Sequence, residues 1–244
     1  MANVSTQFFQ TNIDGFNIPL LNILLSNKQI ISIPSQIGCN NECSFCISKN
    51  QRLIRNLKTD EFLSLINSVP ITSSNVELSF TGEGEPLHNL KNINQVINQV
   101  KFSSLKIAFS GLGSHLISQI NTNIPTTLQF SLHQANQSKR NKLIPKSDSL
   151  ESIKNNLLKY QNNFEKININ YVVVPGENNS TDDLLMLEKF VDGTNWNILF
   201  NPLLTETEMV APQIQDSNLH KVKFYKKIAQ SITDNHIYSN LTYS

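Results

Sequence analysis

Cysteine, glycine and arginine are scarce in this chain, whose 244 residues include three cysteines, eight glycines and three arginines. The cysteines are Cys39, Cys43 and Cys46, and an odd number so closely spaced is a poor framework for disulfide bonds. A bound metal ion or cluster is the more economical explanation for them. An excess of charge of one sign is also absent: the net charge is +1, which excludes an acidic solvating tail and an obvious polyanion binder.

Long apolar runs are missing as well. The longest apolar stretch, near residues 18–25, is interrupted by Pro19 and Asn22, so we expect no segment that spans a membrane. Residues 1–12 contain no basic patch followed by an apolar run, which argues against a secretory signal peptide. We therefore expect a cytoplasmic protein without a membrane partner.

Short strand-like runs alternate with amphipathic helical segments along most of the chain. Strand patterns occur at residues 76–80, 105–109, 128–132, 171–174 and 198–200, and helical spacing occurs at 59–69, 90–100, 150–157, 184–191 and 222–232. A weaker helix is expected at residues 114–121. Because the alternation repeats about six times, the sequence predicts an α/β fold with a parallel sheet, as a partial (β/α)6 barrel.

The N-terminal residues have a different pattern. Residues 16–25 and 29–34 flank a short polar turn, which predicts a β-hairpin that leads into the first barrel strand. We accordingly assign residues 1–30 to an N-terminal β extension and residues 31–244 to the core domain. At the other end, alternation over residues 236–243 predicts an added edge strand.

Unusual polar and glycine-rich residues follow five of the expected strands. In parallel sheets of this kind, ligands bind at the carboxyl ends of the strands, so these residues are expected to share one edge. The five places are residues 38–46, residues 82–86, Ser110 with Gly111, His133, and Asn201 with Pro202.

The cysteines have the spacing C-x3-C-x2-C, with Phe45 directly before the third one. Three thiolates on one short loop can hold three irons of a four-iron, four-sulfur cluster, and no fourth cysteine exists for the remaining iron. An open coordination position is what a catalytic metal centre needs. Two alternatives stay open here. One is a zinc site, although the nearest histidine in sequence, His88, lies 42 residues beyond Cys46; the other is a set of three buried free thiols.

Several segments of the chain, including the start of the cysteine motif, follow one another in the order that they have in a known family. Together they resemble the radical S-adenosylmethionine (SAM) superfamily and, within it, the ribosomal RNA adenine carbon-2 methyltransferases and their antibiotic-resistance relatives. The similarity covers roughly residues 10–244. The segments are SQIGC at 35–39, GEGEPL at 82–87, SLHQAN at 131–136, LIPK at 143–146, YVVVPGENNS at 171–180 and NP at 201–202.

The resemblance implies a barrel of the radical SAM type and two cofactors. Cys39, Cys43 and Cys46 would hold a [4Fe–4S] cluster whose open iron binds SAM, and one electron from the cluster would cleave SAM to methionine and a 5′-deoxyadenosyl radical. Gly84 and Glu85 would belong to the motif that grips the SAM amino group. Ser110, Ser131, Leu132 and His133 would line the ribose and methionine end, and Asn201 would reach SAM from the last strand.

The sequence also departs from the family pattern. The family methylates RNA through a cysteine that carries the methyl group, but all three cysteines here belong to the cluster motif. On this resemblance we expect no counterpart of the family's N-terminal helical domain, and Glu83, which could contact substrate, replaces the family's methionine. We therefore predict a radical SAM enzyme that abstracts hydrogen from an unidentified substrate. Two alternatives are an RNA methyltransferase-like protein that needs a thiol from a partner, and a non-catalytic relative that binds SAM or RNA.

Three basic runs bear on the choice of partner. With a net charge of +1 they give little electrostatic drive toward RNA unless they gather on one face, so we slightly favour a small molecule, peptide or protein as substrate. A one-electron donor such as a flavodoxin or ferredoxin is the second expected partner. The runs are Lys49, Arg52, Arg55 and Lys58; Lys139, Arg140, Lys142 and Lys146; and Lys221, Lys223, Lys226 and Lys227.

Overall fold

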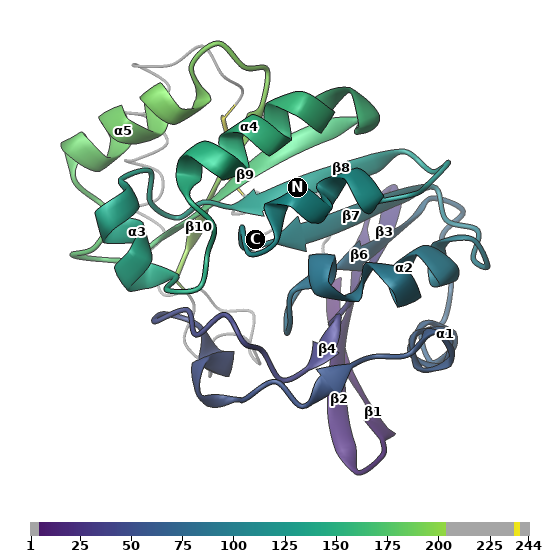
Figure 1. Ribbon diagram of the computed structural model, residues 1–244. Coiled ribbons are helices and arrows are strands. Elements are labelled where there is room, and N and C mark those ends of the chain that lie inside the picture. Colours follow the sequence, from purple (N-terminus) through teal and green to yellow (C-terminus); the bar gives the residue numbers. More distant parts are fainter. Residues whose placement is uncertain (1–4, 204–236, 240–244) are drawn as a thin grey trace.

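The structure is a computed structural model that describes residues 5–203 and 237–239 (Figure 1). Nine strands form one sheet, and β4 and β5 form a separate pair. The strands are β1 (Ser5–Ile13), β2 (Phe16–Leu25), β3 (Lys28–Ile33), β4 (Gln36–Ile37), β5 (Arg55–Asn56), β6 (Val76–Phe80), β7 (Ser104–Phe109), β8 (Thr126–Ser131), β9 (Lys166–Val173), β10 (Asn197–Pro202) and β11 (Ile237–Ser239).

The large sheet joins an antiparallel N-terminal part to a parallel remainder. Its strand order is β1-β2-β3-β6-β7-β8-β9-β10-β11. The pairs β1–β2 and β2–β3 are antiparallel, whereas every later pair is parallel. Because all strands from β3 onward run in the same direction, their carboxyl ends lie along one edge of the sheet.

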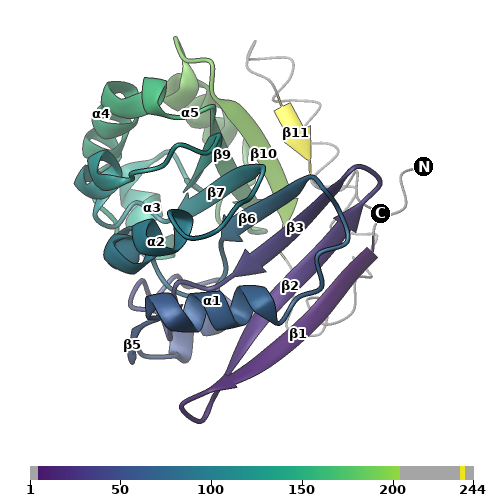
Figure 2. The same cartoon turned by 90° about the vertical axis from the view of Figure 1, so that its right-hand side faces the viewer.

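The helices α1, α2, α4 and α5 lie on one side of the sheet, as Figure 2 shows. Side-chain caps define where several of them begin: Ser149 accepts from the backbone N–H of Ser152 at α4, and Ser180 and Asp183 form a capping box at α5. The helices are α1 (Thr59–Asn67), α2 (Leu90–Ile97), α3 (Gln137–Leu143), α4 (Leu150–Tyr160) and α5 (Thr181–Val191), with 3-10 turns η1 (Ile47–Asn50), η2 (Pro86–Asn89), η3 (Ser114–Gln119) and η4 (Gln161–Asn163).

The hydrophobic core lies between this helical layer and one face of the sheet. Phe80 on β6 and Phe130 on β8 are both fully buried. Phe80 meets Phe62 of α1 edge to face, with ring centroids 5.5 Å apart, and Phe130 lies 5.2 Å from Phe109 of β7. Successive side chains of a strand point to opposite faces, so the period-two apolar pattern places one whole face of the sheet in this core.

The opposite face of the sheet is polar. Glu77 of β6 forms ion pairs with Lys28 of β3 at 2.6 Å and with Lys106 of β7 at 3.0 Å. Burial alone would raise the pKa of Glu77, but the two ammonium groups outweigh it and hold that pKa below its ordinary value. The same face continues on β9 and β10, where the Asn197 amide donates to the Asn168 side-chain oxygen at 2.9 Å.

The predicted α/β architecture, with a mostly parallel sheet, is confirmed. The predicted hairpin corresponds to β2 and β3, and the expected C-terminal edge strand is present as β11 beside β10. The division of the chain at residue 30 stays a prediction. The expected helix at residues 222–232 lies outside the described residues. Within the part of the chain that the structure describes, no helix is both long and apolar enough to cross a membrane.

Three local elements differ from the sequence-based expectation. Strand β1 adds a third antiparallel strand ahead of the predicted hairpin. Residues 114–119 form a 3-10 helix rather than an α-helix. Helix α3 has no counterpart in the prediction because Leu143 is its only apolar residue, so it has no amphipathic periodicity; the Asn136 side chain caps it by accepting from the Lys139 N–H at 3.1 Å.

Phe80→Ala tests how far stability depends on the contact between α1 and the sheet. Phe80 is fully buried, so its truncation should lower the free energy of unfolding by about 3–5 kcal/mol. Phe8→Ala is the matched control, because Phe8 on β1 is 49% exposed and its truncation should cost well under about 1 kcal/mol. Urea unfolding followed by circular dichroism measures both. Equal losses in the two variants would contradict this assignment of the core.

Candidate cluster and cofactor site

The three cysteines lie on a loop between β4 and η1, and all three are half-buried. Cys39 follows β4, and its backbone N–H donates to the Gln51 carbonyl at 3.2 Å. Cys46 caps η1, and its sulfur accepts from the Ser48 N–H at 3.4 Å. The loop is therefore anchored at both ends by backbone hydrogen bonds, while its thiols stay accessible to a ligand.

The environment of Cys39 and Cys43 favours the protonated form of these two thiols in the ligand-free chain. Burial raises the pKa of Cys39, although the backbone N–H groups of Asn41 and Gly84 oppose the shift. Burial, followed by the neighbouring thiols, raises the pKa of Cys43 to about 12, against the opposing charge of Arg140. Binding of a metal centre must displace these protons, so assembly should be favoured by higher pH.

The described residues contain no group of three or more Cys, His, Asp or Glu side chains arranged to hold a single metal ion. A four-iron cluster makes a different demand, because each thiolate binds a different iron and the sulfurs need not converge on one point. Three half-buried thiols within one anchored loop fit that demand. The chemistry of the donor set is thus compatible with a four-iron cluster.

The glycine-rich turn after β6 packs against the cysteine loop. Gly84 has φ +93°, a conformation that favours glycine, and its backbone N–H lies against the Cys39 sulfur. A Cβ at Gly84 would lie 2.6 Å from Gln36 Cβ and 2.7 Å from Ser35 Oγ. The absence of a side chain at Gly84 therefore allows the turn to pack closely against Ser35 and Gln36, just ahead of the cysteine loop.

Glu85, the next residue, is buried and ties the turn to β7. Its Oε2 accepts from the Ser110 hydroxyl at 2.6 Å and from the Ser110 N–H at 2.9 Å, and its Oε1 accepts from the Leu87 N–H at 3.4 Å. Burial raises the pKa of Glu85 to about 7, against the hydrogen bonds of Ser110. A carboxylate with this pKa gains from a cationic ligand group, which would stabilise its ionised form.

Asn41, in the cysteine loop, joins the same network. Its amide nitrogen donates to Ser110 Oγ at 2.8 Å and to Glu85 Oε2 at 3.4 Å. Its Oδ1 is buried and has no hydrogen-bond partner among the described residues. A buried acceptor without a partner is costly, so a ligand that brings a donor to this point would be favoured. The residues around Asn41 therefore fit a polar cofactor such as SAM.

Glu83 holds the two ends of the cysteine loop together. Its carboxylate accepts from the backbone N–H of Gly38, just before Cys39, and from the Ser48 hydroxyl at 3.4 Å, just after Cys46. Its own carbonyl accepts from the Ser35 N–H at 3.0 Å. The hypothesis that Glu83 contacts substrate stays a hypothesis, since these contacts give it a role in holding the loop.

His133 lies directly after β8 and faces the cysteine loop. Its ring packs edge to face against Phe45, with centroids 5.0 Å apart, and its Nδ1 accepts from the Val172 N–H at 2.9 Å. Burial, with a smaller effect of Arg140, lowers the pKa of His133 to about 3. The imidazole is therefore neutral, so it can position the loop and contact a ligand but carries no positive charge.

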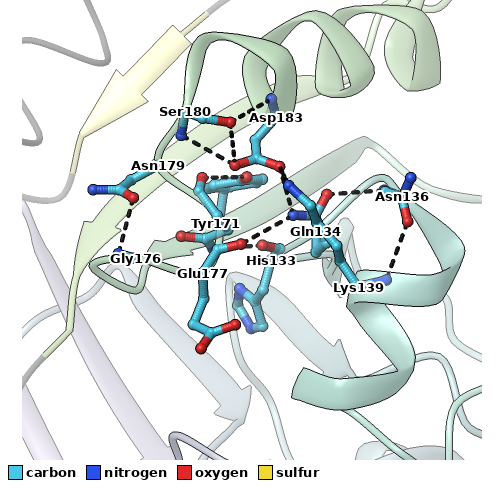
Figure 3. Close-up of polar contacts among 11 residues, drawn as sticks. His133, Gln134, Asn136, Lys139, Tyr171, Gly176, Glu177, Asn179, Ser180 and Asp183 are labelled. Carbon is cyan, nitrogen blue, oxygen red and sulfur yellow. Dashed lines mark hydrogen bonds and ion pairs between the residues drawn. The ribbon is translucent and has the colours of Figure 1, made fainter.

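A network of polar contacts holds the loop that carries His133 (Figure 3). Gln134 donates to Asp183 at 2.9 Å, and Lys139 forms an ion pair with the same carboxylate at 2.8 Å. Asp183 also accepts from the Ser180 hydroxyl at 2.7 Å. These contacts bind the turn after β8 to the beginning of α5 and so determine where the residues at the end of β8 lie.

Arg140 is a functional candidate that the sequence patterns missed. Its guanidinium is fully buried and donates to the carbonyls of Ser110, Ser131 and Leu132, at the ends of β7 and β8. It also lies over the Phe130 ring, 4.9 Å from the centroid. Burial lowers the pKa of Arg140 to about 9, and the nearby Cys43 acts in the opposite direction by raising it. Bound thiolates on the loop would give this cation a counter-charge.

The predicted site residues are thus connected from strand to strand. The cysteine loop touches Gly84, Glu85 binds Ser110, and Arg140 joins the ends of β7 and β8. Asn201 on β10 donates to the side-chain oxygen of Asn170, whose carbonyl accepts from the Leu132 N–H at 3.0 Å. Cys39, Cys43, Cys46, Gly84, Glu85, Ser110, Ser131, Leu132, His133 and Asn201 therefore occupy one edge of the sheet, while their roles toward a cofactor stay predictions.

The basic runs do not form one uniform face. Arg140 is buried, and Lys146 pairs with Glu42 at 2.7 Å. Arg55 is held by Glu61 at 2.7 Å and by Asp14 at 2.6 Å. The third run, at residues 221–227, lies outside the described residues. The sequence alone could not reveal the pairings of Lys146 with Glu42 and of Arg55 with Asp14, because these acids come from distant segments.

Comparison with known proteins identifies a family. A family model of the Radical SAM superfamily matches residues 33–187, which is more than half of the chain. The chain is 30% identical over 240 residues to a probable dual-specificity RNA methyltransferase RlmN of Chlorobium phaeobacteroides, covering 85% of this chain and 66% of that protein. It is 28% identical to the RlmN of Helicobacter pylori, covering 74% of this chain and 55% of that protein. The chain thus spans between about half and two thirds of these relatives.

Solved structures share the fold at lower sequence identity. A radical SAM methyltransferase from Sphaerobacter thermophilus has a TM-score of 0.77 and 19% identity, with 98% of this chain and 73% of that chain covered. SuiB of Streptococcus suis, bound to S-adenosylmethionine, has a TM-score of 0.62 and 13% identity, with 89% and 51% covered. At these identities the likeness supports the fold alone.

Gly84→Ala tests whether the turn after β6 must touch the cysteine loop. Gly82→Ala is the matched control: both residues have positive φ, but a Cβ at Gly82 would meet nothing within 4 Å. We expect the Gly84 variant to retain much less iron after anaerobic reconstitution than the Gly82 variant, at equal soluble yield. Iron and sulfide per chain measure this, and equal retention would contradict the required contact.

Variants of Glu83 test its hold on the cysteine loop. Glu83→Gln keeps an oxygen that can accept from the Gly38 N–H, whereas Glu83→Leu leaves that donor without a partner. The lost hydrogen bond should cost about 1 kcal/mol, which corresponds to about fivefold faster iron loss to a chelator. Wild type and the Gln variant should lose iron at similar rates. Identical rates in all three proteins would show that the side chain holds nothing.

Proposed function

The chain belongs to the radical SAM superfamily, and we propose that Cys39, Cys43 and Cys46 hold a [4Fe–4S] cluster whose open iron binds SAM. When bound, such a cluster supplies the electron that cleaves SAM to methionine and a 5′-deoxyadenosyl radical, which abstracts hydrogen from the substrate. The observation that carries the proposal is the packing of the three-cysteine loop against Gly84. The anchored thiols and the backbone of Gly84, which has no side chain, therefore lie at the same edge of the sheet.

The chain's own residues bind and orient SAM. The Glu85 carboxylate accepts hydrogen bonds from the SAM ammonium, and because its pKa is raised to about 7, this interaction strengthens as the pH rises through neutrality and the carboxyl group ionises. Asn41 Oδ1, which lacks a partner, accepts a second donor from the ligand. His133 stays neutral and fills the site beside Phe45. Ser110, Ser131, Leu132 and Asn201 line the ribose and methionine end.

The substrate class needs revision after the comparisons. The expected preference for a small molecule, peptide or protein is not supported, because curated relatives are named RNA methyltransferases. RNA is therefore an equal candidate substrate. Methyl transfer through a protein thiol would require a cysteine beyond the three of the cluster motif, and these 244 residues contain none. An RNA-methylating activity would therefore need a thiol from outside these 244 residues, and a partner that donates it is the alternative tested below.

Production of 5′-deoxyadenosine from SAM tests the proposed function. Reconstituted protein reduced with dithionite should form 5′-deoxyadenosine and methionine in equal amounts, as measured by liquid chromatography. Cys39→Ala should lose the cluster absorbance and reduce product to background, since the open-iron site needs all three thiolates. SAM binding by a reduced, cluster-containing protein that never yields 5′-deoxyadenosine would refute the enzymatic proposal and support the non-catalytic alternative.

A second arm of the same experiment addresses RNA. Ribosomal RNA, transfer RNA and methyl-labelled SAM are incubated with the reduced protein, with and without an extract that could supply a thiol partner. Label in RNA only with the extract supports the partner-thiol alternative. Label with the purified protein alone would require a methyl-transfer route that does not use a protein thiol.

A further inference from the structure

Exposed apolar side chains gather directly after the cysteine loop. Seven large hydrophobic residues are exposed among the described residues, and three of them lie between residues 47 and 54. They are Ile47, Leu53 and Ile54, with exposed fractions of 43%, 38% and 55%. Nearly half of the exposed large hydrophobic residues thus fall in one eight-residue segment, which makes that segment a candidate interaction site. Together with Lys49 and Arg52, we call this surface the basic apolar patch.

The charge of the basic apolar patch has one sign. Lys49 and Arg52 are exposed, and neither takes part in an ion pair among the described residues. Residues 47–54 contain no aspartate or glutamate. The neighbouring Arg55, in contrast, is neutralised by Glu61 and Asp14. An acidic protein surface would complement this patch.

The patch is attached to the proposed cluster loop. Cys39 donates its backbone N–H to Gln51 O at 3.2 Å, and the Ile54 N–H donates to Ile37 O at 2.8 Å. A Cβ at Gly38 would lie 2.0 Å from the Arg52 carbonyl oxygen, so the two backbones are in close contact beside Cys39. Because electron transfer slows steeply with distance, a protein that reduces the cluster must dock at such a place.

We propose that the basic apolar patch is the docking surface for a small acidic protein that carries one electron at low potential. The inference rests on the proposed function, which requires that electron. The reduced flavin or iron–sulfur centre of the donor loses one electron and the cluster gains it, with no bond made or broken. Apolar contacts combined with polar ones at their edge are typical of protein–protein interfaces. RNA is the less suitable occupant, because the patch has only two unpaired cations and no aromatic side chain for stacking.

Charge reversal of the patch tests the proposal. Anaerobic stopped-flow measures cluster reduction by reduced flavodoxin and, separately, by reduced ferredoxin at low salt, comparing wild type with Lys49→Glu/Arg52→Glu. The matched control is Lys91→Glu/Lys101→Glu, which changes the net charge equally at exposed lysines outside the patch. We expect the patch variant to be reduced about tenfold or more slowly by at least one donor, and the control to change less than about twofold.

Two further measurements separate the possible failures. Dithionite, a small reductant, should reduce all three proteins at equal rates; a selective defect of the patch variant with dithionite would place the damage in the cluster and overturn the docking proposal. Ile54→Ser should weaken donor binding, measured by titration with oxidised donor, even in high salt, because its contribution is apolar. Equal donor rates and equal donor affinities for patch and control variants would overturn the proposal.

The remaining outcomes are also decisive. If the patch variant loses affinity for RNA in filter binding while donor reduction is unchanged, the surface binds RNA and the proposal is wrong. If donor-dependent reduction fails in the patch variant as expected, but wild type never forms 5′-deoxyadenosine with any reductant, the docking surface stands and the proposed function fails. The two hypotheses are thus tested by different readouts.

Discussion

The contact between the cysteine loop and the turn after β6 is the constraint on which the rest of the site depends. Gly38 and Glu83, 45 residues apart in sequence, meet through a hydrogen bond; the Gly84 N–H lies against Cys39, and the lack of a side chain at Gly84 lets the turn pack closely on Ser35 and Gln36. This contact is possible only because β3 and β6 are parallel neighbours whose chains leave the sheet at the same edge. Loop anchoring, thiol placement and the position of Glu85 all follow from it.

Buried charge is distributed unevenly around this contact. Glu85 and Arg140 are both buried, and neither forms an ion pair within the described residues. Glu85 accepts hydrogen bonds from Ser110, and Arg140 donates to carbonyl groups at the strand ends. Burial of such groups costs free energy unless they are satisfied. A cationic ligand group beside Glu85 and thiolates near Arg140 would each relieve part of this cost, so the site is organised for ligands of opposite charge at two points.

Much of the fold and of the candidate site could be predicted from the sequence, for identifiable reasons. Period-two and 3.6-residue patterns predict most strands and helices because one face of each element is buried. Helix α3 lacks such a pattern, since a cap and the burial of Arg140 hold it in place. From the sequence, Arg140 would be assigned to a surface basic run, and only the fold shows that it is buried. Glu83 is visible in the sequence as a departure from a family motif, but its bonds to Gly38 and Ser48 are not.

The sequence by itself determined the kind of chemistry: three thiols within eight residues are a local feature, and their spacing alone limits what they can bind. It also shows that these 244 residues hold no thiol beyond that motif. Only the tertiary structure decided which residues surround those thiols and which basic residues remain unpaired. The physical reason is that burial, ion pairing and hydrogen bonding join segments far apart in the chain, so they depend on strand order and on which strand ends meet at one edge of the sheet.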